Sequence, residues 1–226
     1  MARKTTRREA SGLISATLAA AAAKSTEVLA AAAPSDIDPQ SGGRLPLPRR
    51  EELDPDAQRI YDEFASPNGG SLRGLRGPGG LYLHSPKLAT RLRPLINYLR
   101  AETGFSGRTR EIAILAAARE CDSQFEWAAH EAEAIRQGVP TATLDAIKRR
   151  KSTSGLETAD AIVIDLCRAA YHAHKVPSDL YARAINQFGK QQVVDLVMLM
   201  GYYVMTAGLL TTFDMQLDDG VKPPLP

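Results

Sequence analysis

The sequence predicts an all-α protein, a helical bundle of seven or eight helices. Three observations lead to this prediction. Apolar residues recur at the three- and four-residue spacing of amphipathic helices along most of residues 55–217. No stretch of the chain shows the apolar and polar alternation of a convincing strand. The segments between the expected helices are mostly short, as in bundles of neighbouring helices.

The first expected helix follows an extended arm at residues 34–54, which is rich in Pro and Gly and lacks periodicity. Asp54 is predicted as the N-cap of that helix and Pro55 as its first residue. A glycine-rich loop at 66–80 comes next. It lacks the Gly-Lys-Ser/Thr ending of a phosphate loop and is either a surface loop or a lid over a pocket. A second helix starts at Pro86.

Five more helices are expected in the middle of the chain. Residues 107–120 are apolar nearly all round, which indicates a buried helix. The following helix has Asp122 or Ser123 as its cap and stops at Gly138. Further helices are expected at residues 140–150 and 156–173, and another from Pro177 to about Gly189.

The last helix, from Gln191 to about Met215, carries no charge between Leu196 and Phe213. Its length alone would allow a membrane span. Its two glycines, two tyrosines and three threonines instead favour a buried or oligomer-facing helix, and we expect no membrane span. Residues 218–226 form a C-terminal arm, so the helical domain is expected to cover residues 55–217.

Composition narrows the class of protein. Hydrophobic residues make up 44% of the 226 residues and charged residues 24%, as in soluble globular proteins. The net charge of +2 and the lack of a basic stripe with interleaved aromatics argue against nucleic acid as a partner. Cys121 and Cys167 are the only cysteines, too few for a disulfide scaffold, and they form no CxxC.

Residues 1–33 resemble an export signal. Arg7 and Arg8 precede a weakly apolar run of small residues, and cleavage within Ala30–Ala33 would leave Pro34 just beyond the cut. We therefore expect export to the periplasm by a twin-arginine-like route. An Ala-rich helical or disordered extension of a cytoplasmic protein is the alternative. A mitochondrial transit peptide is a third interpretation, which two glutamates in the segment weaken.

The candidate catalytic residues lie within residues 108–130. Ser123, Glu126 and His130 stand at i, i+3 and i+7, so they share one helix face. A carboxylate beside an imidazole holds one tautomer, which suits proton transfer at neutral pH. Trp127 lies next to this face and is expected to wall a pocket. The alternative is an exposed Glu126–His130 helix pair without function.

Glu111 is the one acid inside the apolar run of its helix, with Arg108 one turn before it. A carboxylate on a buried helix is costly unless it is paired or used. An ion pair with Arg108, Arg110 or Arg119 is therefore as acceptable an interpretation as a catalytic role.

A metal site built from Glu111, Glu126 and His130 is disfavoured. Carboxylate-bridged metal bundles use Glu-x-x-His on paired helices, whereas this chain has one Glu-x-x-x-His. We expect neither a metal nor another cofactor.

The stretch RTREIAILAAARECDSQFEWAAHEAEAIRQGV resembles the carboxymuconolactone decarboxylase family, which shares its fold with alkylhydroperoxidase D. The family pattern is R-x-R-E-[IL]-x-[IL], then E-W-x-x-H about a dozen residues later, then a glycine. This chain matches it at Arg108, Arg110, Glu111, Glu126, Trp127, His130 and Gly138. The stretches RGPGGLYLHSPKLATRLRPLINYLR and QQVVDLVMLMGYYVMTAGLLTTFDM are also similar, so the resemblance spans roughly residues 50 to 220.

The resemblance implies an alkylhydroperoxidase D-like helical fold that forms homo-oligomers, commonly trimers or hexamers, with a pocket beside the Glu and His helices. It implies a cofactor-independent enzyme that is carboxy-lyase-like, carrying out decarboxylation or a related lyase, isomerase or hydrolase step on a small carbonyl or lactone acid. His130 is then the proton donor or oxyanion partner, Glu126 orients it, and Glu111 is a second acid or base. Arg108 or Arg119 is expected to hold a substrate carboxylate, and Ser123 and Trp127 to line the substrate site.

Two other interpretations stay open. The peroxidase branch of the family needs CxxC before the histidine, where this chain has Ser123 and Glu126, and neither is a comparable soft nucleophile. A thiol peroxidase would therefore have to use Cys121 with Cys167. A non-catalytic, oligomeric small-molecule-binding member of the family is the remaining alternative.

Overall fold

The computed structural model describes residues 36–67 and 72–226, and within them it contains eight α-helices and no β-strand. The predicted all-α class with seven or eight helices is confirmed. The predicted signal segment at 1–33 lies outside the described residues. The helices are α1 (Pro55–Ala65), α2 (Pro78–Leu83), α3 (Pro86–Asn97), α4 (Gly107–Glu120), α5 (Gln124–Arg136), α6 (Thr141–Lys148), α7 (Thr158–Tyr171) and α8 (Ser178–Thr212), with a 3-10 turn η1 (Arg50–Glu52) and a π-helical turn η2 (Tyr98–Glu102).

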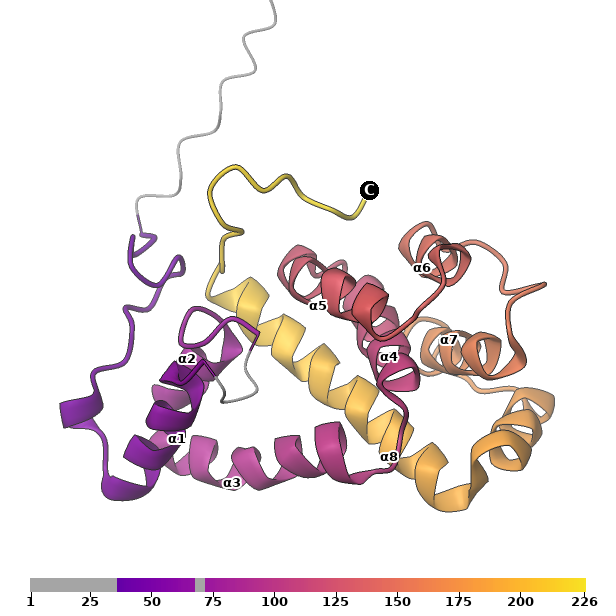
Figure 1. The fold of residues 1–226 in the computed structure, drawn as a ribbon, viewed down its shortest axis with the longest axis horizontal. Helices are drawn as coiled ribbons and strands as arrows, with labels where there is room; N and C mark the ends of the chain where they lie inside the picture. The colour runs from indigo at the N-terminus through magenta and orange to yellow at the C-terminus, as the bar shows by residue number, and fades with distance from the viewer. Residues whose placement is uncertain (1–35, 68–71) are drawn as a thin grey trace, which may run out of the picture. The chain divides into compact units, whose positions relative to one another are not determined.

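The helices between residues 36 and 226 form two groups. The first is α1, α2 and α3, which bury a small apolar cluster that includes Ile60, Phe64 and Leu83. The second centres on α4, which contacts α5, α6, α7 and α8 and is buried over most of its length. α8 contacts both groups and runs between them (Figure 1). The larger apolar cluster, around Ile114 and Leu196, lies in this second group.

Helix starts follow the capping residues of the sequence. The side chain of Asp54 accepts a hydrogen bond of 2.9 Å from the backbone N–H of Ala57, as predicted for the N-cap of α1. Ser123 rather than Asp122 caps α5, because its Oγ accepts from the backbone N–H of Glu126. Gly138 follows α5 with a φ of 80°, where glycine ends a helix without strain.

Helix α2 was not predicted, because its glycines resemble a loop. Pro78 opens α2, and both Gly79 and Gly80 are buried. A Cβ atom on Gly80 would lie only 2.1 Å from the carbonyl oxygen of Leu75, so glycine alone fits there. Close backbone packing, not flexibility, therefore explains the glycines in the second half of the expected loop at 66–80.

The long helix α8 bends at Gly189, whose φ of 79° and ψ of 166° are not helical. This bend separates the two helical segments expected around residue 189. The expectation of no membrane span needs correction. α8 is long and apolar enough to cross a membrane, with a mean hydropathy of 1.8 over its best 18-residue window. Half of that window is buried inside the protein, and a core helix of a soluble protein meets the same criteria.

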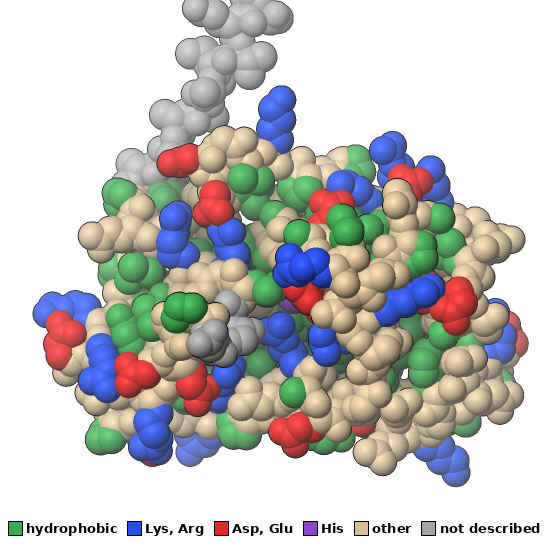
Figure 2. Space-filling view, viewed as in Figure 1, with side chains coloured by type: hydrophobic (Ala, Val, Ile, Leu, Met, Phe, Trp, Pro, Cys, Tyr) green, Lys and Arg blue, Asp and Glu red, His purple; other side chains and the backbone are tan. Residues whose placement is uncertain are grey.

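The two arms of the domain are fastened to it. The backbone N–H of Arg44 donates to the carbonyl oxygen of Phe213 at 2.8 Å. At the other end, Leu225 is buried, and its backbone N–H and carbonyl both bond the side chain of Gln124 at the start of α5. Figure 2 shows basic and acidic side chains interspersed over one face, rather than gathered by sign.

Candidate functional site

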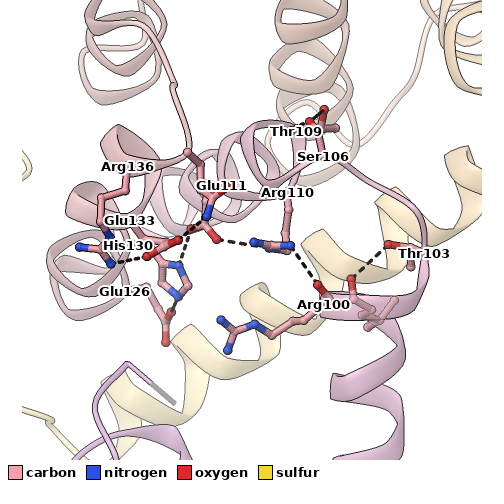
Figure 3. A network of polar contacts seen from close by, with 12 residues as sticks. Arg100, Thr103, Ser106, Thr109, Arg110, Glu111, Glu126, His130, Glu133 and Arg136 are labelled. Carbon is pink, nitrogen blue, oxygen red and sulfur yellow. Dashed lines mark hydrogen bonds and ion pairs between the residues drawn. The ribbon is translucent and has the colours of Figure 1, made fainter. Parts of the chain in front are cut away.

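His130 of α5 is held by Glu111 of α4. Its Nδ1 lies 2.7 Å from Glu111 Oε2, and both side chains are buried (Figure 3). A carboxylate only accepts hydrogen bonds, so Nδ1 carries the ring hydrogen. The second oxygen of Glu111 accepts a longer bond of 3.4 Å from Nε of Arg110. Glu111 thus fixes the tautomer and the orientation of the imidazole.

The other nitrogen of His130 faces Glu126. Nε2 lies 3.6 Å from Glu126 Oε2, which is too long for a hydrogen bond. A proton could still pass between the two atoms through a bound molecule, or directly after a small movement of either side chain. Burial raises the pKa of Glu126, and the neighbouring His130 and Arg100 partly offset this effect. The edge of the His130 ring contacts Tyr203, with ring centroids 5.2 Å apart. The imidazole is therefore clamped between two acids and an aromatic ring.

Glu126 and His130 line a pocket between the first helix group (α1 to α3) and the second (α4 to α8). It has a volume of about 50 Å³, which is room for a few waters. Phe64, Ile96 and Phe125 supply apolar lining, and Glu126 and His130 reach it from α5. The remaining polar lining is Arg73, Arg93, Arg100, Tyr82, Tyr202, Tyr203 and Thr206. A cavity that combines an apolar lining with convergent polar groups is the usual form of a ligand site.

Arg100 brings a positive charge to this pocket. It lies on the π-helical turn η2, a form that often marks functional positions. Its side chain extends toward Glu126 and His130 (Figure 3). The pKa of Arg100 is raised, first by Tyr203 and further by Glu111 and Glu126, so its guanidinium stays charged. The sequence prediction missed Arg100, because nothing in its local pattern distinguishes it from the surface arginines beside it.

The structure brings together three of the seven predicted site residues: Glu111, Glu126 and His130. Ser123 is the buried cap of α5 and lies at a different surface hollow, beside Asp122 and Gln124. Trp127 is fully buried in the larger apolar cluster, with Lys148 Nζ 5.6 Å from its ring centre. Neither residue lines the pocket that holds His130.

The two arginines expected to bind substrate are engaged elsewhere. Arg108 makes two hydrogen bonds, of 2.6 and 3.1 Å, to the buried carboxylate of Asp160 on α7. Arg119 donates to the backbone oxygen of Lys148 at 2.7 Å and pairs with Asp122. Neither arginine lines the pocket, so both act here as links between helices.

The cysteines also lie apart from the pocket. Cys121 and Cys167 are both free thiols, at the end of α4 and within α7. Burial raises the pKa of Cys121 and of Cys167, which disfavours the nucleophilic thiolate. Over the described ranges 36–67 and 72–226, no three His, Cys, Asp or Glu side chains are grouped so that they would hold a metal ion.

No protein-family model, no curated protein and no solved structure matches this chain. The case for a function therefore depends on the geometry of the site.

Proposed function

We propose that the protein is a cofactor-independent acid–base enzyme of the carboxymuconolactone decarboxylase type, acting on a small carbonyl or lactone acid. One observation carries the proposal: Glu111 holds Nδ1 of His130 at 2.7 Å, so that Nε2 and Glu126 meet a buried pocket. An oriented base beside a second titratable group is the arrangement that general acid–base catalysis needs.

The proposed reaction is the loss of carbon dioxide from the bound acid. The bond between the carboxylate carbon and its neighbour breaks, and its electron pair moves into the substrate and onto the carbonyl oxygen. Carbon dioxide leaves, and the proton of Glu126, whose pKa is raised by burial, then reaches the carbon either directly or relayed through Nε2 of His130. The enzyme regains that proton from water, so no oxidant or reductant is required.

The geometry favours a change in three of the roles expected from the sequence. Glu111 orients the imidazole, because it makes the short bond to Nδ1. Glu126 is the second acid or base, because it lines the pocket and faces Nε2. Arg100 replaces Arg108 and Arg119 as the proposed partner of the substrate carboxylate, since it is the one of the three that lines the pocket.

The test is turnover of a panel of small β-keto acids and unsaturated lactone acids, with carbon dioxide release and deuterium uptake from heavy water as readouts. His130→Ala should abolish both while circular dichroism shows an intact helical fold. Ile135→Ala is the matched control, because Ile135 is on the same helix and is mostly exposed. Turnover by His130→Ala at the rate of the control would refute the proposal.

A further inference from the structure

A second polar group, built from hydroxyls, lines the same pocket. The phenol oxygen of Tyr82 on α2 lies 3.1 Å from that of Tyr202 on α8 and 2.7 Å from Oγ1 of Thr206, one turn further along α8. Tyr82 and Thr206 are buried, and all three side chains reach the pocket that holds Glu126 and His130. None of these three hydroxyls takes part in the proton transfer between Glu126, His130 and the substrate.

The hydrogens of these hydroxyls can be arranged in two ways. Thr206 lies within reach of Tyr82 and also of the backbone oxygen of Tyr202, at 2.9 Å. If Thr206 donates to that backbone oxygen, the hydrogen of Tyr82 is shared between Thr206 and Tyr202, both of which lie within hydrogen-bond distance of it. If Thr206 donates to Tyr82, then Tyr82 donates to Tyr202, and the hydrogen of Tyr202 is left to point into the pocket that its side chain lines. A ligand oxygen in the pocket would select the second arrangement.

That second arrangement makes Tyr202 a strong donor. Each hydroxyl that receives a hydrogen bond is polarised and gives a stronger one, and the effect grows where water is excluded. Burial raises the pKa of Tyr202, while hydrogen bonds from Tyr82 and Thr206 lower it. Tyr202 therefore keeps its proton at neutral pH and presents it to the pocket, where Arg100 adds a positive charge.

We propose that Tyr202 is a catalytic residue that donates a hydrogen bond to the substrate's carbonyl oxygen, with Tyr82 and Thr206 as positioning residues behind it. This inference rests on the proposed function. As carbon dioxide leaves, the electron pair of the broken bond moves onto that oxygen, and the bond from Tyr202 strengthens. The proton stays on Tyr202 throughout, and Glu126 supplies the proton that reaches carbon, directly or through Nε2 of His130. The substrate class is thereby narrowed to acids whose carbonyl oxygen becomes an enolate oxygen.

The probe is 4-nitrophenol, whose ionised form mimics an enolate oxygen and is visible by its colour. Tyr202→Phe should weaken binding of the 4-nitrophenolate ion about tenfold or more, the usual effect of losing a hydrogen bond to a charged group. Tyr82→Phe should weaken it less, because Tyr202 remains. Tyr181→Phe is the matched control, since Tyr181 is an exposed tyrosine on α8, and should bind as the unmodified protein does. On a substrate found in the turnover panel, Tyr202→Phe should lower kcat about 10²- to 10³-fold with little change in KM.

The binding measurement separates this inference from the proposed function. Unchanged 4-nitrophenolate binding by Tyr202→Phe, or no binding by the unmodified protein, would overturn the role of Tyr202, whatever His130→Ala shows. Weaker binding by Tyr202→Phe, together with equal turnover by His130→Ala and its control, would support Tyr202 as an oxyanion donor and reject the acid–base chemistry. Thermal unfolding of each variant checks that the loss is not one of folding.

Discussion

Replacing the two glutamates beside His130 by glutamine should change stability in opposite directions. Glu111→Gln keeps the shape of the side chain but turns a charge-assisted hydrogen bond of 2.7 Å to Nδ1 into a neutral one. A hydrogen bond to a charged group contributes about 1.5–3 kcal/mol and a neutral one about 0.5–1.5 kcal/mol, so the variant should lose about 1–2 kcal/mol. Glu111 is fully buried, so water does not replace the lost interaction.

Glu126→Gln should instead stabilise the protein at neutral pH. Burial raises the pKa of Glu126 above its ordinary 4.5. The folded state therefore holds the proton more tightly than the unfolded chain, and this contribution to stability is complete below 4.5 and is lost as pH rises through the folded pKa. Glutamine remains neutral throughout, so its advantage should appear on going from about pH 4 to about pH 8.

Urea unfolding of both variants and of the unmodified protein at these two pH values measures the effects. An unchanged denaturant slope shows that the states compared are the same. Glu111→Gln should lower Tm by about 2–8 °C. If Glu111→Gln were neutral or stabilising at neutral pH, or if both variants moved in the same direction, the division of roles between the two acids would be wrong.

Three further predictions concern residues outside the pocket. Arg108→Ala should cost about 1.5–3 kcal/mol in urea unfolding, because buried Asp160 loses its charged donor, while turnover stays unchanged. Gly189→Ala should cost about 1–3 kcal/mol through backbone strain alone, since no atom would contact its Cβ, whereas Gly208→Ala within α8 should stabilise by about 0.5–1 kcal/mol. Cys121→Ser should keep full turnover; a large loss would favour thiol chemistry.

The fold class and most helix boundaries could be predicted from the sequence, because the residues that start and stop helices act locally. Caps such as Asp54 and stops such as Gly138 each act within one turn of the helix that they delimit. The missed helix α2 shows the limit of this reasoning. Gly80 is required by the carbonyl of Leu75 in the turn directly before α2, and a glycine needed for such a close backbone approach looks the same in the sequence as a glycine of a loop.

The site could be predicted only in part, because sequence spacing reveals only contacts within one helix. Glu126 and His130 are one turn apart on one helix, so their spacing places them together. Tyr202 and Arg100 come from segments far from α5 in the chain, and only the packing of α8 and η2 brings them to the pocket. The opposite error concerns Arg108. Arg108 stands one turn before Glu111 in the sequence, but its side chain instead makes a bidentate pair with Asp160 on α7.

A buried glutamate–histidine pair also occurs as a plain link between helices, so the preference for chemistry needs a physical reason. Such a link is complete once Glu111 has bonded Nδ1 of His130. Glu126 does not strengthen this link between α4 and α5, because burial raises the pKa of Glu126 and makes its charged form costly. An apolar residue at that position would stabilise the protein more. Glu126 lies 3.6 Å from Nε2 and lines the same cavity as Arg100 and Tyr202, an arrangement that the proposed ligand would complete.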